Sequence, residues 1–332
     1  MNPLYVVALS PPALAVLYGC WFAYSYKYHT ARVHVPWRQF VTRMILMVDC
    51  FVWEYVCGVE RKLHFSQCKK DRTGLTDDEG LATYKKHKKI MWTACPHHLL
   101  IPSFAFAFKA ERDKIHARMG VNLDEIFTAA ASILFYIPII RDIVITLGGR
   151  VASPEVLNDM KMFALAPGGI HEMIRQEEKA DKIFLRTGFI RFAIKKQLDI
   201  TPIYLFDENS VYKPLSNLPK SLVTFQRYCH RKFGIGFSMW KGRWDIPFNP
   251  IPYPCEYLVG VGKPIPIDLV KGVEDEDEAI EILMEKYVAE VERLFKELQK
   301  ESGRRGDVKL EVERLMRRAE RQGGKAGKKK GD

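Results

Sequence analysis

The side chains best suited to chemistry in this chain lie in the tetrapeptide Cys95-Pro96-His97-His98. An apolar β-type segment, residues 89–94, comes before it, and an apolar helical run, residues 99–108, comes after it. This pattern predicts a strand-to-helix turn with imidazole groups at its apex. A neutral imidazole, with an unperturbed pKa of about 6.5, can accept a proton near neutral pH. The turn therefore indicates general-base chemistry on a hydroxyl group, although a histidine beside a proline is also a common structural feature of turns.

Further motifs follow in order along the chain. The apolar run 133–140 leads into Arg141-Asp142, and Gly148-Gly149 comes next. The others are Phe163-Ala164-Leu165-Ala166-Pro167-Gly168-Gly169-Ile170-His171-Glu172, Thr187-Gly188-Phe189-Ile190-Arg191 and Pro202-Ile203-Tyr204-Leu205-Phe206-Asp207-Glu208-Asn209-Ser210-Val211-Tyr212. The series resembles the diacylglycerol O-acyltransferase type 2 family, which has a His-Pro-His-Gly turn, a Gly-Gly-x-x-Glu block and a Pro-Ile-Tyr-x-Phe-Gly-Glu-Asn-x-x-Tyr block. The resemblance covers about residues 35–268, and the last block is its most specific part.

The chain departs from the family pattern within two of these blocks. Cys95 stands in place of the first histidine and His98 in place of the glycine of the turn, and Asp207 replaces the glycine before Glu-Asn. The resemblance implies a membrane-bound O-acyltransferase that moves a fatty acyl group from acyl-CoA to the hydroxyl of a neutral glycerolipid. Diacylglycerol, giving triacylglycerol, is the default acceptor, with monoacylglycerol or a long-chain (wax) alcohol as alternatives. The changes at Cys95 and His98 also keep open a non-catalytic lipid-binding relative.

The resemblance also assigns roles to individual residues. His97 matches the second histidine of the family turn and is the expected general base, with His98 as its rival. Glu172 is expected to position the acceptor or the imidazole, and a capping or surface carboxylate is the alternative. Substrate binding is expected from three groups of residues. Gly168 and Gly169 let backbone N–H groups approach a ligand, and Arg141 and Arg191 suit phosphate or a polar headgroup. Asn209 and Tyr212 come from the last block.

Apolar runs that alternate with helical patterns predict the elements that position these groups. Strands are expected at 90–94, 163–166, 182–185, 200–206 and 257–261, and helices at 154–161, 188–197 and about 215–232. This alternation predicts an α/β fold, a glycerolipid-acyltransferase-like sheet covered by helices. A strong amphipathic helix begins after residue 275 and ends at Ser302-Gly303, and residues 307–322 are expected to form a second, polar helix. Residues 233–254 read as an aromatic loop, either near a membrane or substrate mouth or simply packed.

The N-terminal part of the chain predicts membrane attachment. Residues 3–26 carry no charge before Lys27, and Pro11-Pro12 leaves a straight span and a re-entrant hairpin equally plausible. Arginines at positions 32, 38 and 43 then place the body of the chain in the cytosol. Residues 40–59 are expected to form a helix that lies in the membrane interface or against the domain, with a second membrane span as the alternative. The resulting division is a membrane anchor and interfacial helix at 1–60, an acyltransferase domain at 61–300, and a charged helix with a disordered basic tail at 301–332.

Composition limits the partners. The 332 residues carry a formal net charge of +11, which suits an anionic membrane or the phosphates of coenzyme A, and no nucleic-acid-binding motif is present. Seven scattered cysteines without a Cys-x-x-Cys pair argue for a reducing compartment and against a metal site. We expect acyl-CoA as the co-substrate and no cofactor. Lys329 and Lys330 resemble a dilysine signal for the endoplasmic reticulum, and a Lys-rich tail attracted to anionic lipid is the alternative explanation. The lipid droplet is an alternative location. A homo-oligomer is left open.

Overall fold

The computed structural model describes residues 57–65, 89–98, 126–137, 140–146, 148–175, 177, 180–215, 218–233, 236, 238–249, 251–303 and 306–315. The predicted membrane segment, the helical run 99–108 and the basic tail lie outside these residues. Within the described part of the chain, none of the helices combines the length and the apolar character that a bilayer span requires.

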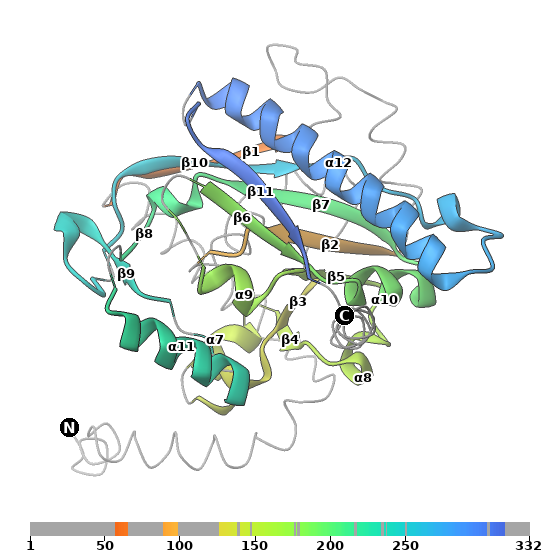
Figure 1. The fold of residues 1–332 in the computed structure, drawn as a ribbon, viewed down its shortest axis with the longest axis horizontal. Helices are drawn as coiled ribbons and strands as arrows, with labels where there is room; N and C mark the ends of the chain where they lie inside the picture. The colour runs from red at the N-terminus through yellow and green to blue at the C-terminus, as the bar shows by residue number, and fades with distance from the viewer. Residues whose placement is uncertain are drawn as a thin grey trace, which may run out of the picture.

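A seven-stranded mixed sheet forms the centre of the molecule, with strand order β1-β10-β7-β2-β5-β3-β4 (Figure 1). Its strands are β1 (Val59–Phe65), β2 (Ile90–Cys95), β3 (Phe127–Ala130), β4 (Gly149–Val151), β5 (Met162–Leu165), β7 (Asp199–Phe206) and β10 (Cys255–Val261). Neighbouring strands are parallel except β10 and β7. Every residue of β2 and β7 is buried, as expected for central strands covered on both faces.

Helices and short 3-10 turns connect these strands. They are η3 (Ser132–Tyr136), α7 (Ile140–Thr146), α8 (Pro154–Leu157), α9 (Ile170–Met173), α10 (Gly188–Lys196), η4 (Glu208–Ser210), α11 (Lys220–Phe233), η5 (Arg243–Asp245), η6 (Ile267–Val270) and α12 (Glu276–Ser302). Helix α10 buries Phe189, Ile190 and Ala193 in the core, and the Phe189 ring packs against Tyr287 of α12. The chain then turns into β7 through Gln197, which takes the left-handed conformation at the end of the helix.

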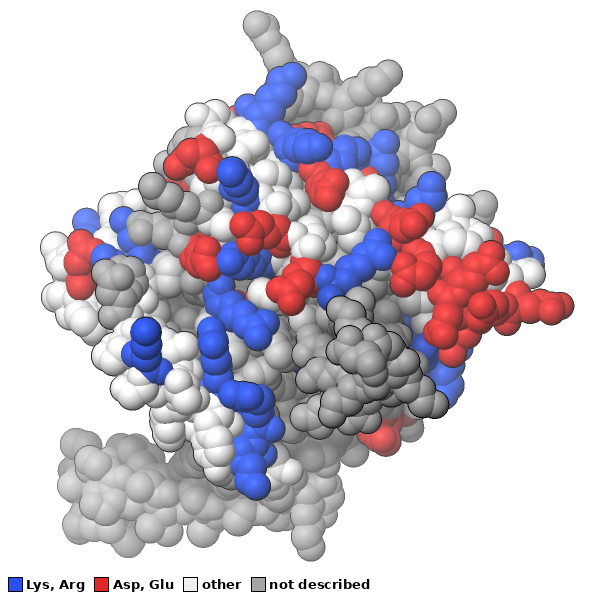
Figure 2. Space-filling model, in the orientation of Figure 1, with Lys and Arg blue, Asp and Glu red and all other residues white. Residues whose placement is uncertain are grey.

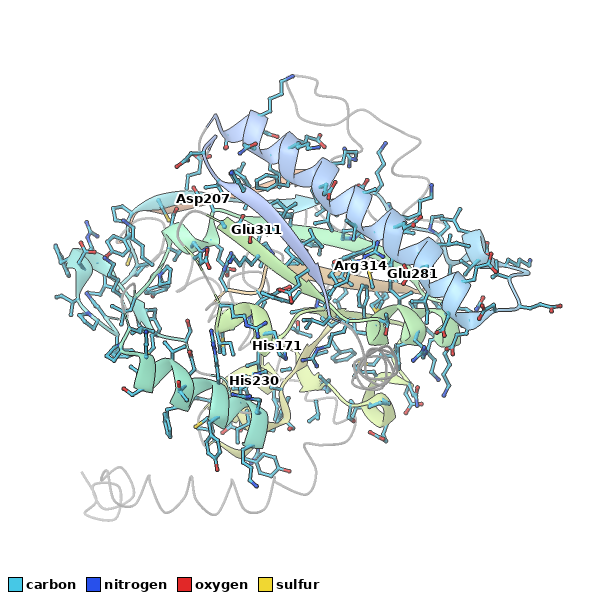
Figure 3. The ribbon with its side chains drawn as sticks, in the orientation of Figure 1. His171, Asp207, His230, Glu281, Glu311 and Arg314 are labelled. Atoms are coloured by element: carbon cyan, nitrogen blue, oxygen red, sulfur yellow. The ribbon has the colours of Figure 1, made fainter. Side chains whose placement is uncertain are left out.

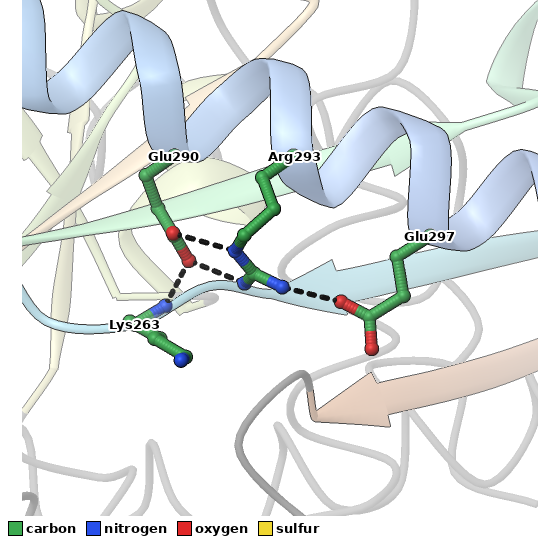
Figure 4. Close-up of polar contacts among 4 residues, drawn as sticks. All are labelled: Lys263, Glu290, Arg293 and Glu297. Atoms are coloured by element: carbon green, nitrogen blue, oxygen red, sulfur yellow. Dashed lines mark hydrogen bonds and ion pairs between the residues drawn. The ribbon is translucent and has the colours of Figure 1, made fainter.

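Helix α12 crosses one face of the sheet over β7 and β10 (Figure 1). The Asp275 side chain caps its start by accepting a hydrogen bond from the backbone N–H of Asp277 (3.0 Å), and Gly303 ends it at a φ of 61°. Its buried stripe includes Leu283, Tyr287, Leu294 and Leu298. Full burial of each such side chain contributes about 1.5–3 kcal/mol. A polar group on the helix also binds the segment after β10: Glu290 accepts from the backbone N–H of Lys263 and from Arg293, which also contacts Glu297 (Figure 4).

Two small two-stranded sheets complete the described fold. Strand β6 (Ala180–Leu185) pairs in parallel with β11 (Lys309–Arg314), and β8 (Lys213–Pro214) pairs in antiparallel fashion with β9 (Trp240–Lys241). The β6–β11 pair lies on the same side of the main sheet as α12 (Figure 1). The hydroxyl of Tyr204 on β7 donates a hydrogen bond to Asp181 Oδ2 on β6 (2.8 Å), which ties the small sheet to the large one.

The α/β prediction is confirmed, and each of the five predicted strands is present within one or two residues of its expected position. The prediction of a polar helix over 307–322 is wrong for residues 309–314. These residues form β11, because their alternation places Leu310 and Val312 on the partly buried face while the backbone pairs with the open edge of β6. The sheet also begins at Val59 in β1, inside the segment expected to be an interfacial helix and anchor.

Candidate active site

The central parallel strands bring the predicted motifs to one edge of the sheet. Thr93 on β2 pairs with Leu165 on β5, and Cys95 pairs with Tyr204 on β7. The turn after Cys95, the segment after Leu165 and the turn after Phe206 therefore all leave the sheet at the carboxyl ends of its strands. This is the edge where open α/β sheets bind their ligands.

His97 sits in a half-buried turn directly after β2. The turn begins with a cis peptide bond between Cys95 and Pro96. His97 Nδ1 lies 2.7 Å from the carbonyl oxygen of His98. A carbonyl can only accept, so Nδ1 carries the proton and donates it, which leaves Nε2 of the neutral ring as a proton acceptor. Burial lowers the pKa of His97 to about 4, so the ring is neutral at physiological pH.

Glu172 holds this turn in place from the next motif. Its Oε2 accepts a hydrogen bond from the backbone N–H of His97 (2.6 Å), and its Oε1 accepts one from the backbone N–H of Phe184 on β6 (2.9 Å). The side chain is only 2% exposed, and burial raises the pKa of Glu172 to about 8, while the two N–H donors oppose that shift. Glu172 was predicted to position the acceptor or the imidazole. Its described contacts are with backbone, so it fixes the turn that carries the imidazole rather than the ring itself.

The two glycines before α9 make this arrangement possible. A Cβ on Gly168 would lie 2.1 Å from Glu172 Oε1, so only glycine leaves room for the carboxyl group to fold back against the loop. Gly169 has a φ of 51° and a ψ of −137°, a conformation that side chains rarely adopt. The sequence predicted close approach of a ligand at these glycines; the contact that the structure places there is Glu172.

We expect Gly168→Ala to lower activity strongly, because the new methyl group must displace the Glu172 carboxyl group and release the His97 turn. Gly188→Ala is the matched control, since a Cβ there meets nothing within 4 Å. At such a compatible position the change to alanine should be neutral or stabilise by about 0.4–1 kcal/mol. Initial rates and thermal melting of the two variants check this, and a fully active Gly168→Ala protein would contradict the role of Glu172.

His98 and Cys95 are both more deeply placed than His97. His98 is 3% exposed and Cys95 is fully buried at the end of β2. The Cys95 Sγ lies 3.6 Å from the hydroxyl of Tyr287 on α12. Burial, with a smaller contribution from the Glu172 charge, raises the pKa of the Cys95 thiol well above its ordinary value. A thiol in this state is a poor nucleophile, and His97 is the more accessible of the two imidazoles.

Cys95→Ser should therefore keep appreciable activity, because the reaction at His97 does not need the thiol. The hydroxyl is smaller than the thiol and should mainly loosen the contact with Tyr287. The check is a turnover measurement combined with a search for an acyl-thioester on the wild-type protein. An acyl group trapped on Cys95 would refute direct transfer.

The last predicted block forms the turn after β7. Asp207 takes the left-handed conformation with a φ of 71°, which explains why glycine fits this position in the family pattern, and its Oδ1 accepts from Ser210 Oγ (2.6 Å). Asn209 is buried, and its Nδ2 donates to the carbonyl of Glu177 (3.4 Å), which connects this turn to the segment after α9. Tyr212 is also buried and packs edge-on against Trp240, with ring centroids 4.8 Å apart.

The two predicted cations differ in position. Arg141 is 1% exposed, and its Nε lies 3.9 Å from Asp142 Oδ1. Arg191 pairs with Glu276 (2.8 Å) and Asp277 (3.2 Å) at the start of α12. The start of α12 comes soon after η6. Ile267 of η6 donates its backbone N–H to Asp199 Oδ1, and Asp199 is the first residue of β7. The start of α12 therefore lies near the amino end of β7, at the opposite edge of the sheet from His97. The structure therefore does not bring Arg191 to the candidate site.

The site also includes groups that the motifs did not identify. The backbone N–H of Phe184 contacts Glu172, and the hydroxyl of Tyr287 contacts Cys95. No local sequence pattern predicts these contacts. His171 and His230 also meet, with ring centroids 4.5 Å apart. Within the described ranges, no group of three or more His, Cys, Asp or Glu side chains is arranged to hold a metal ion.

Comparison with known proteins agrees with the motif series. A family model described as diacylglycerol acyltransferase matches residues 79–313. The chain is 25% identical to diacylglycerol O-acyltransferase 2 from Dictyostelium discoideum over 225 residues, which cover 64% of this chain and 67% of that protein. It is 26% identical to 2-acylglycerol O-acyltransferase 1 from Mus musculus over 180 residues, 50% of this chain and 53% of that protein.

These matches span about half to two thirds of the relatives' own length. A crystal structure of the 1-acyl-sn-glycerophosphate acyltransferase from Thermotoga maritima aligns at a TM-score of 0.40 and 14% identity, over 84% of this chain and 88% of that chain. The family model covers well over half of the sequence and includes each of the motifs from His97 to Tyr212. This chain belongs to the diacylglycerol acyltransferase family.

Proposed function

We propose that this protein transfers a fatty acyl group from acyl-CoA to the hydroxyl group of a neutral glycerolipid, with diacylglycerol as the principal acceptor and triacylglycerol as the product. The observation that carries the proposal is the 2.7 Å contact between His97 Nδ1 and the His98 carbonyl oxygen, which makes Nδ1 the donor and leaves Nε2 to accept a proton. Family membership gives the class of reaction in which such a base is needed.

The proposed reaction needs no covalent enzyme intermediate. Nε2 of His97 removes the proton of the acceptor hydroxyl while its oxygen attacks the thioester carbonyl carbon. This attack forms the new carbon–oxygen bond and gives a tetrahedral adduct. The adduct then collapses: the carbonyl double bond re-forms, the carbon–sulfur bond breaks, and the imidazolium gives its proton to the departing thiolate of coenzyme A. Glu172 contributes by fixing the backbone of the turn, and the carbonyl of His98 keeps Nδ1 protonated throughout.

The acceptor is tested by incubating membranes that contain the full chain with labelled acyl-CoA and a panel of acceptors. Diacylglycerol is expected to give the most product, and membranes with His97→Ala are the matched control. Larger turnover with monoacylglycerol, the alternative that the similarity to 2-acylglycerol O-acyltransferase 1 favours, or with a long-chain alcohol would reassign the acceptor. A correctly inserted protein that gives no product with any acceptor would instead be a non-catalytic lipid-binding relative.

We place this activity on the membrane of the endoplasmic reticulum, with the catalytic domain facing the cytosol. An apolar acceptor dissolves in the bilayer, whereas acyl-CoA approaches from the cytosol. The loop between β9 and β10 supports membrane contact, because its large apolar side chains are exposed: Trp244 (66%), Ile246 (51%) and Phe248 (54%). Trp244 and Phe248 have positive φ angles. Backbone hydrogen bonds inside the loop, such as Gly242 N–H to Ile246 O (3.1 Å), hold the loop in the conformation that exposes these side chains.

Cell fractionation and protease treatment of sealed microsomes test the location. We expect the protein in the microsomal pellet, with an internal tag in the catalytic domain open to added protease. Recovery in the soluble fraction would contradict membrane attachment, and a protected tag would contradict the topology.

A further inference from the structure

A cluster of four arginines surrounds the His171–His230 pair. Arg175 follows α9, Arg186 follows β6, and Arg227 and Arg231 lie one turn apart on α11. Arg175 is half-buried and the other three are exposed. Figure 3 shows the two histidines facing each other between α9 and α11, and Figure 2 shows a column of basic side chains on this face, running from the middle of the molecule to the end of α11. We call this set the arginine cluster.

Three of these arginines, Arg175, Arg186 and Arg231, lie close enough to the two histidines to lower their pKa values. Burial lowers the pKa of His171 to about 4, with further lowering by Arg186, His230 and Arg175. The pKa of His230 is lowered by burial and then by Arg186, Arg175 and Arg231. Burial, helped by the nearby positive charges, therefore keeps both rings neutral. His171 Nδ1 is buried and has no hydrogen-bond partner in the structure.

The cluster borders a cavity of about 360 Å³. Arg175 and Arg227 line it on one side, and Arg175 also lies over the ring of Phe184 at 4.9 Å. Three carboxylates also line it: Glu177, Glu311 and Glu313. Lys182 pairs with the first two, at 2.6 Å from Glu177 and 3.4 Å from Glu311. Among the residues that the structure describes, none of the four guanidinium groups forms an ion pair. Arg175 and Arg227 at this cavity, together with Arg186 and Arg231 beside the two histidines, favour a polyanionic ligand.

Glu172 connects the arginine cluster to the catalytic turn. One of its carboxyl oxygens holds the backbone of His97, and the other holds the backbone of Phe184, two residues before Arg186. His171 directly precedes Glu172, and the backbone N–H of Arg175 donates to the Glu172 carbonyl (3.1 Å). Two members of the cluster, Arg175 and Arg186, are therefore carried by the two segments that fix the position of His97, while Arg227 and Arg231 come from α11.

We propose that the arginine cluster binds the phosphate groups of the coenzyme A donor, the ribose 3′-phosphate and the diphosphate. This inference rests on the proposed function and adds the donor-binding residues to it. Guanidinium groups bind phosphate through paired hydrogen bonds, which a lysine cannot match. The pantetheine arm of the donor then leads from these phosphates to a thioester beside His97. The neutral rings of His171 and His230 offer a surface for the adenine base. Arg191, paired with α12, has no part in this site.

The test is equilibrium binding of labelled coenzyme A to the full chain in detergent. Replacing Arg227 and Arg231 together by Glu leaves the core intact, because both side chains are exposed. We expect the dissociation constant to rise about 10–100-fold, the effect of losing charge-assisted hydrogen bonds. Lys286→Glu with Lys296→Glu, two exposed positions on α12, makes the same change in net charge and should leave binding unchanged. Adenosine 3′,5′-diphosphate should compete better than adenosine 5′-monophosphate.

Unchanged coenzyme A binding in the Arg227 and Arg231 variant would overturn the inference. If that variant also loses binding to vesicles of anionic phospholipid, the cluster binds the membrane surface instead of the donor. Because binding is measured without turnover, it decides this inference even if the proposed function fails. Transfer assays separate the two: the variant should show a raised KM for acyl-CoA and an unchanged KM for acyl-pantetheine, which lacks the nucleotide. A wild-type protein that binds coenzyme A but uses neither donor would refute the transferase activity alone.

Discussion

Replacing His97 with Ala is expected to lower turnover by about 10²–10⁴-fold, the usual loss when a general base is removed. The half-buried ring makes its described hydrogen bond only to the neighbouring carbonyl of His98, so its removal should leave the fold and membrane attachment intact. Rates from labelled acyl-CoA, measured at equal amounts of membrane-bound protein, give the effect.

His98→Ala distinguishes the two imidazoles. His98 is 3% exposed, so truncating it creates a cavity and should lower thermal stability more than it lowers turnover per folded molecule. If His98→Ala abolishes turnover and His97→Ala spares it, the base is His98.

The pH dependence of kcat/KM gives an independent test of His97. Its pKa is lowered to about 4, so the base stays unprotonated well below the ordinary imidazole value of 6.5. The rate should therefore change little between about pH 6.5 and 5, where an ordinary histidine would lose most of its basic form. An acid limb centred near pH 6.5 would show that the catalytic base has an unperturbed pKa and is not this ring.

Removing the Glu172 carboxyl group should have the second large effect, on both stability and turnover. Glu172→Ala leaves the backbone N–H groups of His97 and Phe184 without their acceptor, at about 1–3 kcal/mol for each buried donor. It also frees the turn that carries the imidazole, so kcat should fall in the protein that remains folded. Thermal melting and single-turnover rates separate the two losses.

Glu172→Gln is the conservative control. Its single amide oxygen can accept only one of the two hydrogen bonds, so it should retain more stability than alanine and still impair turnover. The folded-state pKa of Glu172 is raised from 4.5 to about 8, so its stabilising contribution is fully present below pH 4.5 and is lost as the pH rises through 8. This part of the pH dependence of unfolding should disappear in Glu172→Gln. Full activity of Glu172→Gln at pH 7 would remove Glu172 from the site.

The sequence alone predicted the central strands and the position of the reactive turn. Strands β2, β5 and β7 are short apolar runs that end at motif residues, and burial on both faces demands that composition. Helix α12 was equally clear, because its apolar stripe, acidic first turn and terminal glycine all point to one helix. The ordered motifs gave the family, and with it His97 and Glu172 as site residues, whose catalytic roles remain predictions.

The tertiary structure decided which groups meet. Strand β11 read as a polar helix because its charged residues suit one, and only the open edge of β6 makes it a strand. Arg191 sits in a family motif, yet α12 supplies its carboxylate partners from far along the chain. The carboxyl group of Glu172 was visible in the sequence, but its two backbone donors come from turns that meet only when β2, β5 and β6 are assembled. The arginine cluster has no local sequence pattern, because its members come from three separate segments: the end of α9, the end of β6 and helix α11.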